Sequence, residues 1–343
     1  MNPLKIVIPT AGWATRMRPQ TWSKPKPLVS VAGRPALDHL LDMFASVPVK
    51  MQAEYVFIVG PYLGEMQLPP YLQENHPELK THFVLQKVMK GQSDALWLAR
   101  ETLTGPLLVC FSDTLMETDF SFLADEKMDG VAWVKPVPDP RRFGVAELGS
   151  GGLVTRLVEK PQGMENNLVV VGCYYFRQAE ELLSAIEEQF QRGTSLKGEY
   201  FLTDTINIMI ERGMKMRTQN VEVWLDTGTI EATLETNRYL LDHGRGKEPK
   251  NALGQGVVIL PPVFIHETAR INNSTIGPYA SLGAGCQVTG ARVEDSILEN
   301  GVIVESAALK GAFIGRDARV RGRSASDPPL TLNIGDNSSV VID

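Results

Sequence analysis

The chain has 343 residues, of which 43% are hydrophobic and 22% are charged, an ordinary balance for a folded globular protein. This length exceeds what one hydrophobic core usually serves, so two domains are expected. The formal net charge of −6 excludes a broad basic surface for nucleic acid or for an anionic membrane. A small anionic substrate remains compatible, provided that positive charge is concentrated locally.

The sequence shows no secretory leader and no apolar run of membrane-spanning length, so no membrane partner is expected. The cysteines Cys110, Cys173 and Cys286 are far apart and form no CxxC pair, and the five histidines lack metal-ligand spacing. Free thiols in a reducing, cytoplasmic setting are therefore expected, without a zinc site.

Short apolar runs alternate with amphipathic helical patterns from residue 1 to about 240. The pattern predicts strands at 5–9, 54–60, 82–86 and 107–113, and helices at 35–47, 93–103 and 179–193. Further strands at 129–137, 154–161 and 168–176 have no helices between them. The prediction is an α/β fold with a Rossmann-like, mostly parallel mixed sheet that is flanked by helices.

The spacing of hydrophobic residues changes after a polar linker at 241–256. Aliphatic residues recur every five or six positions, from Ile265 and Ile271 to Val320, with small residues between them. This spacing is typical of hexapeptide repeats in a short left-handed parallel β-helix, with a small β-sandwich as the alternative. We expect about three coils and an irregular tail at 323–343 with a final strand. The predicted domains are 1–240 and 257–343.

The loop after the first strand combines small residues with positive charge. Gly12 permits close approach of the backbone, Ala11 and Ala14 are small, and Arg16 and Lys26 follow. A tight turn between a strand and a helix can present backbone N–H groups to an anion. The alternative is an ordinary surface turn with exposed basic residues, and these residues alone leave both interpretations open.

The stretch AGWATRMRPQTWSKPKPLVSVAGRP, residues 11–35, resembles the signature of the sugar-1-phosphate nucleotidyltransferases, or NDP-sugar pyrophosphorylases. The residues in register with that signature are Thr15, Arg16, Pro19, Pro25, Lys26, Gly33 and Pro35. Ala14 departs from it, because the family usually has a second turn glycine there, and Trp13 is bulky for the turn. A stiffer or wider loop is therefore expected.

Further motifs extend the resemblance across about 230 residues, in the expected order. They are VLQKVMKGQSDAL, LLVCFSDT, VTRLVEKPQG, VVVGCYYF, KGEYFLTD and WLDTGT. VVVGCYYF and WLDTGT are most similar to the glucose-1-phosphate thymidylyltransferase branch, and long family members also carry a hexapeptide-repeat tail. The resemblance implies an enzyme that joins a nucleoside triphosphate to a sugar 1-phosphate and releases pyrophosphate.

The resemblance also assigns roles to individual residues. It implies Arg16, Lys26, Asp113 and Asp226 as catalytic residues, with both aspartates holding Mg²⁺. The nucleotide would contact Ala11, Gly12, Trp13, Ala14, Thr15, Gln86, Gly91 and Gln92. The sugar phosphate would contact Gly144, Glu159, Lys160, Gly172 and Trp224. The alternatives are structural: helix-capping aspartates, a strand-end ion pair and ordinary turn glycines.

Specificity is less determined by these motifs. The Gln86 amide is complementary to the O4 and N3–H edge of uracil or thymine, but by itself it does not exclude cytosine. The resemblance to the thymidylyltransferase branch implies dTTP, with UTP second, and glucose 1-phosphate as the sugar. CTP, ATP, GTP or another sugar remain alternatives, as does a catalytically silent regulatory subunit. Acyl transfer in the β-helix, with His266 as base, is a further alternative. A homo-oligomer formed through the β-helix or the catalytic domain is expected.

Overall fold

The computed structural model of the protein describes residues 2–247 and 254–342. Its internal contacts divide the chain into two compact units. The first unit comprises Met1–Trp13 and Leu40–Trp224, and the second comprises Ala14–His39 and Leu225–Asp343. The signature loop from residue 14 onward therefore belongs to the same compact unit as the C-terminal part of the chain. Part of the predicted linker, 248–253, lies outside the described residues.

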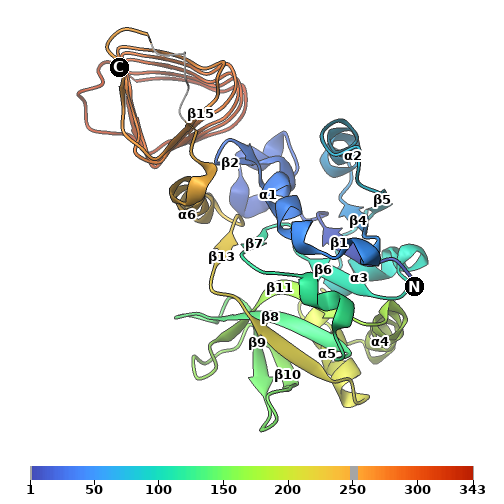
Figure 1. Cartoon of the computed structure of the whole chain (residues 1–343). Helices are drawn as coiled ribbons and strands as arrows, with labels where there is room; N and C mark the ends of the chain where they lie inside the picture. Colours follow the sequence, from blue (N-terminus) through green and yellow to red (C-terminus); the bar gives the residue numbers. More distant parts are fainter. Residues whose placement is uncertain (1, 248–253, 343) are drawn as a thin grey trace. The chain divides into compact units, whose positions relative to one another are not determined.

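The first unit is built on a mixed sheet with the strand order β10-β9-β11-β6-β1-β4-β5, from which β8 and β12 branch at β11 (Figure 1). Strand β1 pairs in parallel with β4 and β6, and β4 pairs in parallel with β5, whereas β11 runs antiparallel to β6, β8 and β9. The predicted mixed α/β fold is thus confirmed. The strands are β1 (Lys5–Pro9), β4 (Glu54–Val59), β5 (Thr81–Leu85), β6 (Leu107–Cys110), β8 (Gly130–Pro136), β9 (Gly144–Leu148), β10 (Val154–Glu159), β11 (Leu168–Phe176) and β12 (Met216–Asn220).

Six α-helices and four short strands precede the β-helix in the described chain. The α-helices are α1 (Ala36–Met43), α2 (Leu63–Asn75), α3 (Gln92–Leu98), α4 (Ala179–Arg192), α5 (Leu202–Glu211) and α6 (Ile230–Leu240). Short strands are β2 (Ser30–Val31), β3 (Arg34–Pro35), β7 (Thr114–Met116) and β13 (Trp224–Asp226). None of the described helices is long and apolar enough to cross a membrane.

The sequence pattern does not predict helix α2. The helix contains Pro69 and Pro70, which normally break a helix interior, and its buried residues are only Gly64, Leu68 and Leu72. These three recur every four residues, so one narrow stripe holds the helix in place. The predicted helix 35–47 divides into α1 and the 3₁₀ turn Phe44–Ser46, which ends where Val47, the residue before Pro48, adopts an extended conformation.

The second unit contains a left-handed parallel β-helix, seen in Figure 1 as a three-sided stack of coils. Val263 pairs with Ala280 and Val288 pairs with Val304, so the coils before the tail are 17 or 16 residues apart. This repeat confirms the predicted spacing of five or six residues per side. The faces are β14 (Val258–Ile259), β17 (Thr275–Ile276), β20 (Arg292–Glu294) and β23 (Ala308–Lys310); β15 (Val263–Ile265), β18 (Ala280–Leu282), β21 (Ile297–Leu298), β24 (Phe313–Ile314) and β26 (Asn333–Ile334); and β16 (Arg270–Asn272), β19 (Gln287–Thr289), β22 (Ile303–Glu305), β25 (Arg319–Arg321) and β27 (Ser339–Val341).

The β-helix has more coils than the three that the repeats predict. Strands β26 and β27 lie in the tail at 323–343 and pair with β24 and β25. The expectation of an irregular tail was therefore wrong over β26, whereas β27 is the expected final strand. The tail interrupts the aliphatic spacing with SASDPP, but Ile334 and Val340 return to register opposite Ile314 and Val320.

Candidate functional site

The loop after β5 holds the predicted base-reading residue. Gln86 is buried, and its Nε2 atom donates to Asp94 Oδ2 at 2.9 Å and to the Gly91 carbonyl at 3.3 Å. Both amide hydrogens therefore have acceptors within the protein. The Oε1 acceptor is then the part of this amide that suits a donor on a base, which narrows the donor-and-acceptor pair expected from the sequence.

Gly91, the residue before helix α3, has a backbone conformation that other residues rarely adopt, with φ of 101°. A Cβ atom at this position would lie 2.4 Å from the carbonyl oxygen of Tyr200. The two segments are joined by backbone hydrogen bonds from Tyr200 N to Lys90 O and from Ser93 N to Tyr200 O. The Gln92 side chain accepts from Leu202 N at 3.1 Å. The predicted nucleotide-binding loop is thus fastened to residues 200–202.

The end of β10 carries the predicted sugar-phosphate residues. Glu159 and Lys160 form an ion pair with an N–O distance of 3.7 Å, and Lys160 Nζ lies 4.6 Å from the centre of the Phe201 ring. Thr203 Oγ1 donates to Glu159 Oε2 at 3.4 Å. Burial raises the pKa of Glu159, and the Lys160 charge opposes this shift. Lys160 also has a left-handed backbone, with φ of 48°, which is uncommon outside glycine.

Residues 200–203 contact both of these groups. Tyr200 and Leu202 bond to the Gln86 loop, whereas Phe201 and Thr203 face Lys160 and Glu159. The sequence motif KGEYFLTD contains this segment, but its pattern gave no firm role for these residues. Their importance depends on contacts between positions that are more than 40 residues apart in the chain.

The two predicted sugar-site glycines lie against different neighbours. A Cβ on Gly144 would be 3.0 Å from Val170 Cγ2 and 3.3 Å from Glu159 Oε2, so its absence leaves space beside the carboxylate. A Cβ on Gly172 would be 2.7 Å from the Phe111 ring. Phe111 N donates to the Gly172 carbonyl at 2.9 Å, in the turn that carries half-buried Asp113. Gly172 therefore packs against the turn of the predicted metal ligand.

Trp224, another predicted sugar-site residue, packs edge-on against Phe143 with ring centres 5.1 Å apart. Its Nε1 atom is buried and has no hydrogen-bond acceptor among the described residues. Phe143 also accepts the backbone N–H of Lys160 through its carbonyl, at 2.9 Å. The indole therefore belongs to the same local cluster as the Glu159–Lys160 pair and brings an unused donor to it.

In the first unit, the predicted phosphate loop begins with buried Ala11 and with Gly12 and Trp13, which are exposed. A Cβ atom on Gly60 would lie only 2.6 Å from the carbonyl oxygen of Ala11. Gly60, the residue after β4, thus lets the loop backbone pass close by. The sequence pattern gave no role to this glycine, although it ends the predicted strand 54–60.

In the second unit, the loop continues through Ala14, whose φ of 46° is left-handed. This conformation explains why a glycine suits the position and why alanine there costs roughly 1–2 kcal/mol. Thr15 and Arg16 follow in a 3₁₀ turn, Thr15–Met17, and both are exposed. Lys26 begins another short turn, Lys26–Leu28.

Arg16 and Asp226 both lie beside Gly228. A Cβ on Gly228 would be 2.7 Å from Asp226 Oδ1 and 3.4 Å from Arg16 Nη2. Asp226 Oδ1 accepts the Gly228 N–H at 2.6 Å, just before helix α6, whose first turn is capped by Thr229. The structure therefore brings one predicted cation and one predicted metal carboxylate together. The hydroxyl of neighbouring Thr227 is buried without a hydrogen-bond partner in the described chain.

Oxygen ligands of this kind suit a hard divalent cation. Among the described residues, no three His, Cys, Asp or Glu side chains gather as a metal cage. Mg²⁺ commonly uses only one or two protein carboxylates together with substrate phosphate oxygens, so Asp113 in the first unit and Asp226 in the second each fit it in chemistry.

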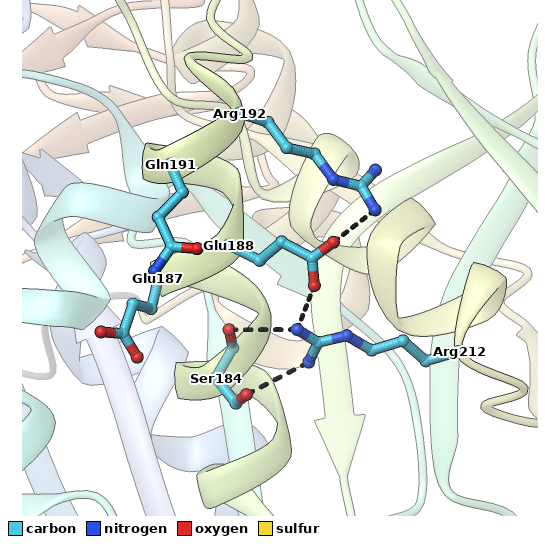
Figure 2. Close-up of a pocket in the computed structure, with 6 residues that line it drawn as sticks. All are labelled: Ser184, Glu187, Glu188, Gln191, Arg192 and Arg212. Atoms are coloured by element: carbon cyan, nitrogen blue, oxygen red, sulfur yellow. Dashed lines mark hydrogen bonds and ion pairs between the residues drawn. The ribbon is translucent and has the colours of Figure 1, made fainter.

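One surface hollow contains none of the predicted site residues. It is lined by Ser184, Glu187, Glu188, Gln191, Arg192 and Arg212. Figure 2 shows Glu188 between Arg192 and Arg212, and Arg212 also donates to Ser184 Oγ at 3.2 Å. Glu188, Arg192 and Arg212 already pair with one another, and these pairs link α4 to the end of α5. The hollow therefore lacks the features of a ligand site.

A mixed α/β sheet whose first strand leads into the Gly12 loop, together with the Glu159–Lys160 pair at the end of β10, is the arrangement expected of a nucleotide-dependent transferase. The family described as nucleotidyl transferase matches residues 5–243. The chain therefore belongs to the nucleotidyl transferase family. It is 29% identical over 371 residues to the glucose-1-phosphate thymidylyltransferase of Streptomyces antibioticus, covering 99% of both chains. It is 31% identical over 270 residues to the bifunctional protein GlmU of Methanocaldococcus jannaschii, over 78% of this chain and 61% of that protein.

Solved structures share the fold. UDP-glucose pyrophosphorylase in complex with UDP-glucose superposes with a TM-score of 0.59 at 19% identity, over 71% of this chain and 100% of that chain. At this identity the likeness concerns the fold alone. The full-length sequence relatives place the chain among sugar-1-phosphate nucleotidyltransferases.

Proposed function

We propose that the protein condenses dTTP or UTP with glucose 1-phosphate to give the NDP-sugar and pyrophosphate, with Mg²⁺ as cofactor. The observation that carries the proposal is the fastening of residues 200–203 to both the Gln86 loop and the Glu159–Lys160 pair. One rigid segment then holds a base-recognition group and a sugar-phosphate group at the same time, as a two-substrate transferase requires.

Base recognition would rest on Gln86. Because its Nε2 hydrogens are engaged by Asp94 and Gly91, its Oε1 would accept the N3–H of uracil or thymine. The similarity of this chain to full-length relatives named as thymidylyltransferases favours dTTP, with UTP as the second candidate.

The sugar phosphate would be held by the cluster at the end of β10. Lys160 would bind the phosphate, Glu159 would accept hydrogen bonds from sugar hydroxyls, and the buried Trp224 N–H would donate to the ligand. Gly144 leaves the space beside Glu159 that such a ligand needs. Gly172 would support the turn that carries Asp113.

The triphosphate would lie against the backbone of residues 11–15, with Arg16 and Lys26 supplying positive charge. A phosphate oxygen of the sugar phosphate attacks the α-phosphorus, the bond to the β-phosphate oxygen breaks, and pyrophosphate leaves with that electron pair. The nucleophile is already an anion, so no general base is needed. Mg²⁺ held by Asp113 and Asp226 would neutralise the charge on the phosphates.

A pyrophosphate-release screen tests the proposal by crossing five nucleoside triphosphates with several sugar 1-phosphates. We expect the highest kcat/KM for dTTP or UTP with glucose 1-phosphate. The Asp113→Asn variant should lower kcat by roughly 100-fold or more, as loss of a preorganised stabiliser does. A preference for a purine nucleotide, or full activity of Asp113→Asn, would contradict the assignment.

Self-association is proposed on a different basis. The flat faces of the β-helix suit packing against a second copy of the chain. Light scattering of the purified protein over a range of concentrations measures its mass directly, and a monomer throughout that range would contradict this proposal.

A further inference from the structure

The signature loop is attached to the β-helix by a buried ion-pair cluster. Lys24 is only 7% exposed, and its ammonium group pairs with Glu299 and, at 3.1 Å, with Asp336. Asp336 also accepts from Ser23 Oγ at 2.7 Å. Glu299 follows strand β21, and Asp336 follows β26. Two coils of the β-helix thus hold one lysine of the KPKP sequence.

Gln20 makes a second attachment a few residues earlier. This side chain is fully buried, and its Nε2 atom lies 3.0 Å from the Phe313 carbonyl, 2.8 Å from Asn333 Oδ1 and 3.0 Å from the Ile334 carbonyl. In return, Asn333 Nδ2 donates to the Arg18 carbonyl at 3.3 Å. The Gln20 side chain and the backbone just before it are therefore held by strands β24 and β26.

A third attachment lies at the end of the signature, at Ala32 and Gly33. Ala32 N donates to Asn237 Oδ1 at 2.9 Å, and the same oxygen accepts from Ser281 Oγ of β18. A Cβ on Gly33 would lie only 2.1 Å from the Phe264 ring of β15. The signature glycine is therefore required by close contact with the β-helix.

These attachments lie close to the two cations of the loop in the chain. Arg16 lies two residues before Arg18, and Lys26 lies two residues after Lys24. Met17 and Val29 belong to one buried apolar cluster with Ile297 and Phe313 of the β-helix. A buried cluster of three charges adds little net stability over apolar side chains of similar size, but it fixes geometry. Its presence beneath a loop that must align a triphosphate is better explained by positioning than by stability.

We propose that the β-helix is a working part of the nucleotide site, in which Lys24, Glu299 and Asp336 are positioning residues for Arg16 and Lys26. This inference rests on the proposed binding of the triphosphate by those two cations. It assigns different tasks to the two lysines of KPKP: Lys24 anchors the loop to the β-helix, and Lys26 contacts the ligand.

The test compares Glu299→Gln with Glu294→Gln in the full chain. Both remove one carboxylate charge from the β-helix, but Glu294 pairs with exposed Lys310, away from the loop contacts. We expect Glu299→Gln to raise the KM for the nucleoside triphosphate by about 10-fold to 100-fold, because small displacements of binding groups are costly. The KM for sugar 1-phosphate should stay near the wild-type value, and Glu294→Gln should change neither.

Ser23→Ala is a milder variant, which removes one hydrogen bond to Asp336 and keeps the ion pairs. It should raise the same KM by a smaller factor, and it serves if Glu299→Gln does not fold. Unchanged nucleotide KM in Ser23→Ala and Glu299→Gln, with only a lower Tm, would overturn the positioning role. An equal rise in both substrates' KM values would also overturn it.

Arg16→Gln and Lys26→Gln, measured alongside, separate this inference from the proposed function. If they raise the nucleotide KM while Glu299→Gln does not, only the positioning role fails. If they leave the nucleotide KM unchanged, the triphosphate assignment fails and the positioning role fails with it.

Discussion

At the scale of single residues, the pair at the end of β10 shows how one motif acquires its chemistry. Glu159 and Lys160 are sequence neighbours, yet their side chains meet Thr203 and Phe201 of a distant segment. These contacts leave the carboxylate mostly buried and the ammonium group half exposed. A buried acceptor beside an accessible cation is suited to a ligand that has both hydroxyls and a phosphate.

Replacing Lys160 tests the proposed phosphate contact. In Lys160→Met we expect kcat/KM for sugar 1-phosphate to fall about 10-fold to 100-fold, since a charge-assisted contact to phosphate is lost. The KM for the nucleotide should change little. Steady-state kinetics with each substrate varied in turn measures the effect. Lys127→Met, which alters an exposed lysine of the same unit, is the control, and equal losses in both variants would contradict the role.

The ionisation of Glu159 gives a pH prediction. Its pKa is raised by burial, so in the folded protein the carboxylate gains its proton at a higher pH than an ordinary glutamate does. Because the ionised form is the better acceptor, the KM for sugar 1-phosphate should rise as pH falls through this raised pKa. Lys160→Met should move that rise to still higher pH, because the opposing charge is gone. A profile that Glu159→Gln leaves unchanged would assign the rise to another group.

At the scale of elements, the segment between α4 and α5 determines the geometry of the candidate site. Tyr200 occupies the space that a side chain at Gly91 would need, and Leu202 N donates a hydrogen bond to the Gln92 side chain. Helix α5 starts at Leu202, so the contacts to Lys160 and Glu159 come from its first turn and the residue before it. The helix is therefore the rigid support of this segment.

Gly91→Ala tests that close approach. The new Cβ would meet Tyr200 O at 2.4 Å in a backbone with φ of 101°, so the loop or the segment must move. We expect a loss of about 2–4 kcal/mol in the free energy of unfolding and a higher nucleotide KM. Gly193→Ala is the matched control, because Gly193 has φ of 65° but no neighbour within 4 Å of its Cβ position.

The control should cost only about 1 kcal/mol, from the backbone conformation alone. Denaturant unfolding of both variants measures the difference. Equal losses in the free energy of unfolding would show that the contact with Tyr200 does not contribute to the destabilisation.

At the scale of the whole molecule, buried ion pairs in each unit link stability to acid. In the first unit, hydrogen bonds from Lys5 and Lys80 hold the pKa of Glu54 at about 2. In the second unit, burial would raise the pKa of Asp336, but Ser23 and Lys24 outweigh it and the pKa lies below the ordinary value. Both carboxylates bind their proton less readily in the folded state than in the unfolded chain.

Stability from such groups is present above the unfolded pKa and is lost as pH falls through the folded value. Unfolding by denaturant should therefore become easier between the ordinary pKa of Glu54, 4.5, and about 2. Glu54→Gln should cost about 3 kcal/mol near neutral pH, because buried Lys5 loses its partner. It should also flatten the acid dependence, and an unchanged slope would assign that dependence to other carboxylates. Glu181→Gln, at an exposed position, is the control.

The sequence by itself determined the α/β fold, the β-helix and the family, since these depend on local periodicity and on motifs that occur in a fixed order along the chain. The sequence pattern does not predict α2, because Pro69 and Pro70 normally break a helix and only a single stripe of buried residues holds this one. It also does not predict β26 in the tail, which forms because β24 of the preceding coil offers a strand edge to pair with.

Only the tertiary structure decided which residues meet. The approach of Arg16 to Gly228, the contact of Phe201 with Lys160 and the anchoring of Lys24 by Glu299 join positions far apart in the chain. Such contacts are set by the packing of whole elements, which leaves no repeating signal in the local sequence. The signature stretch encodes the family, and the β-helix supplies the surface that holds it.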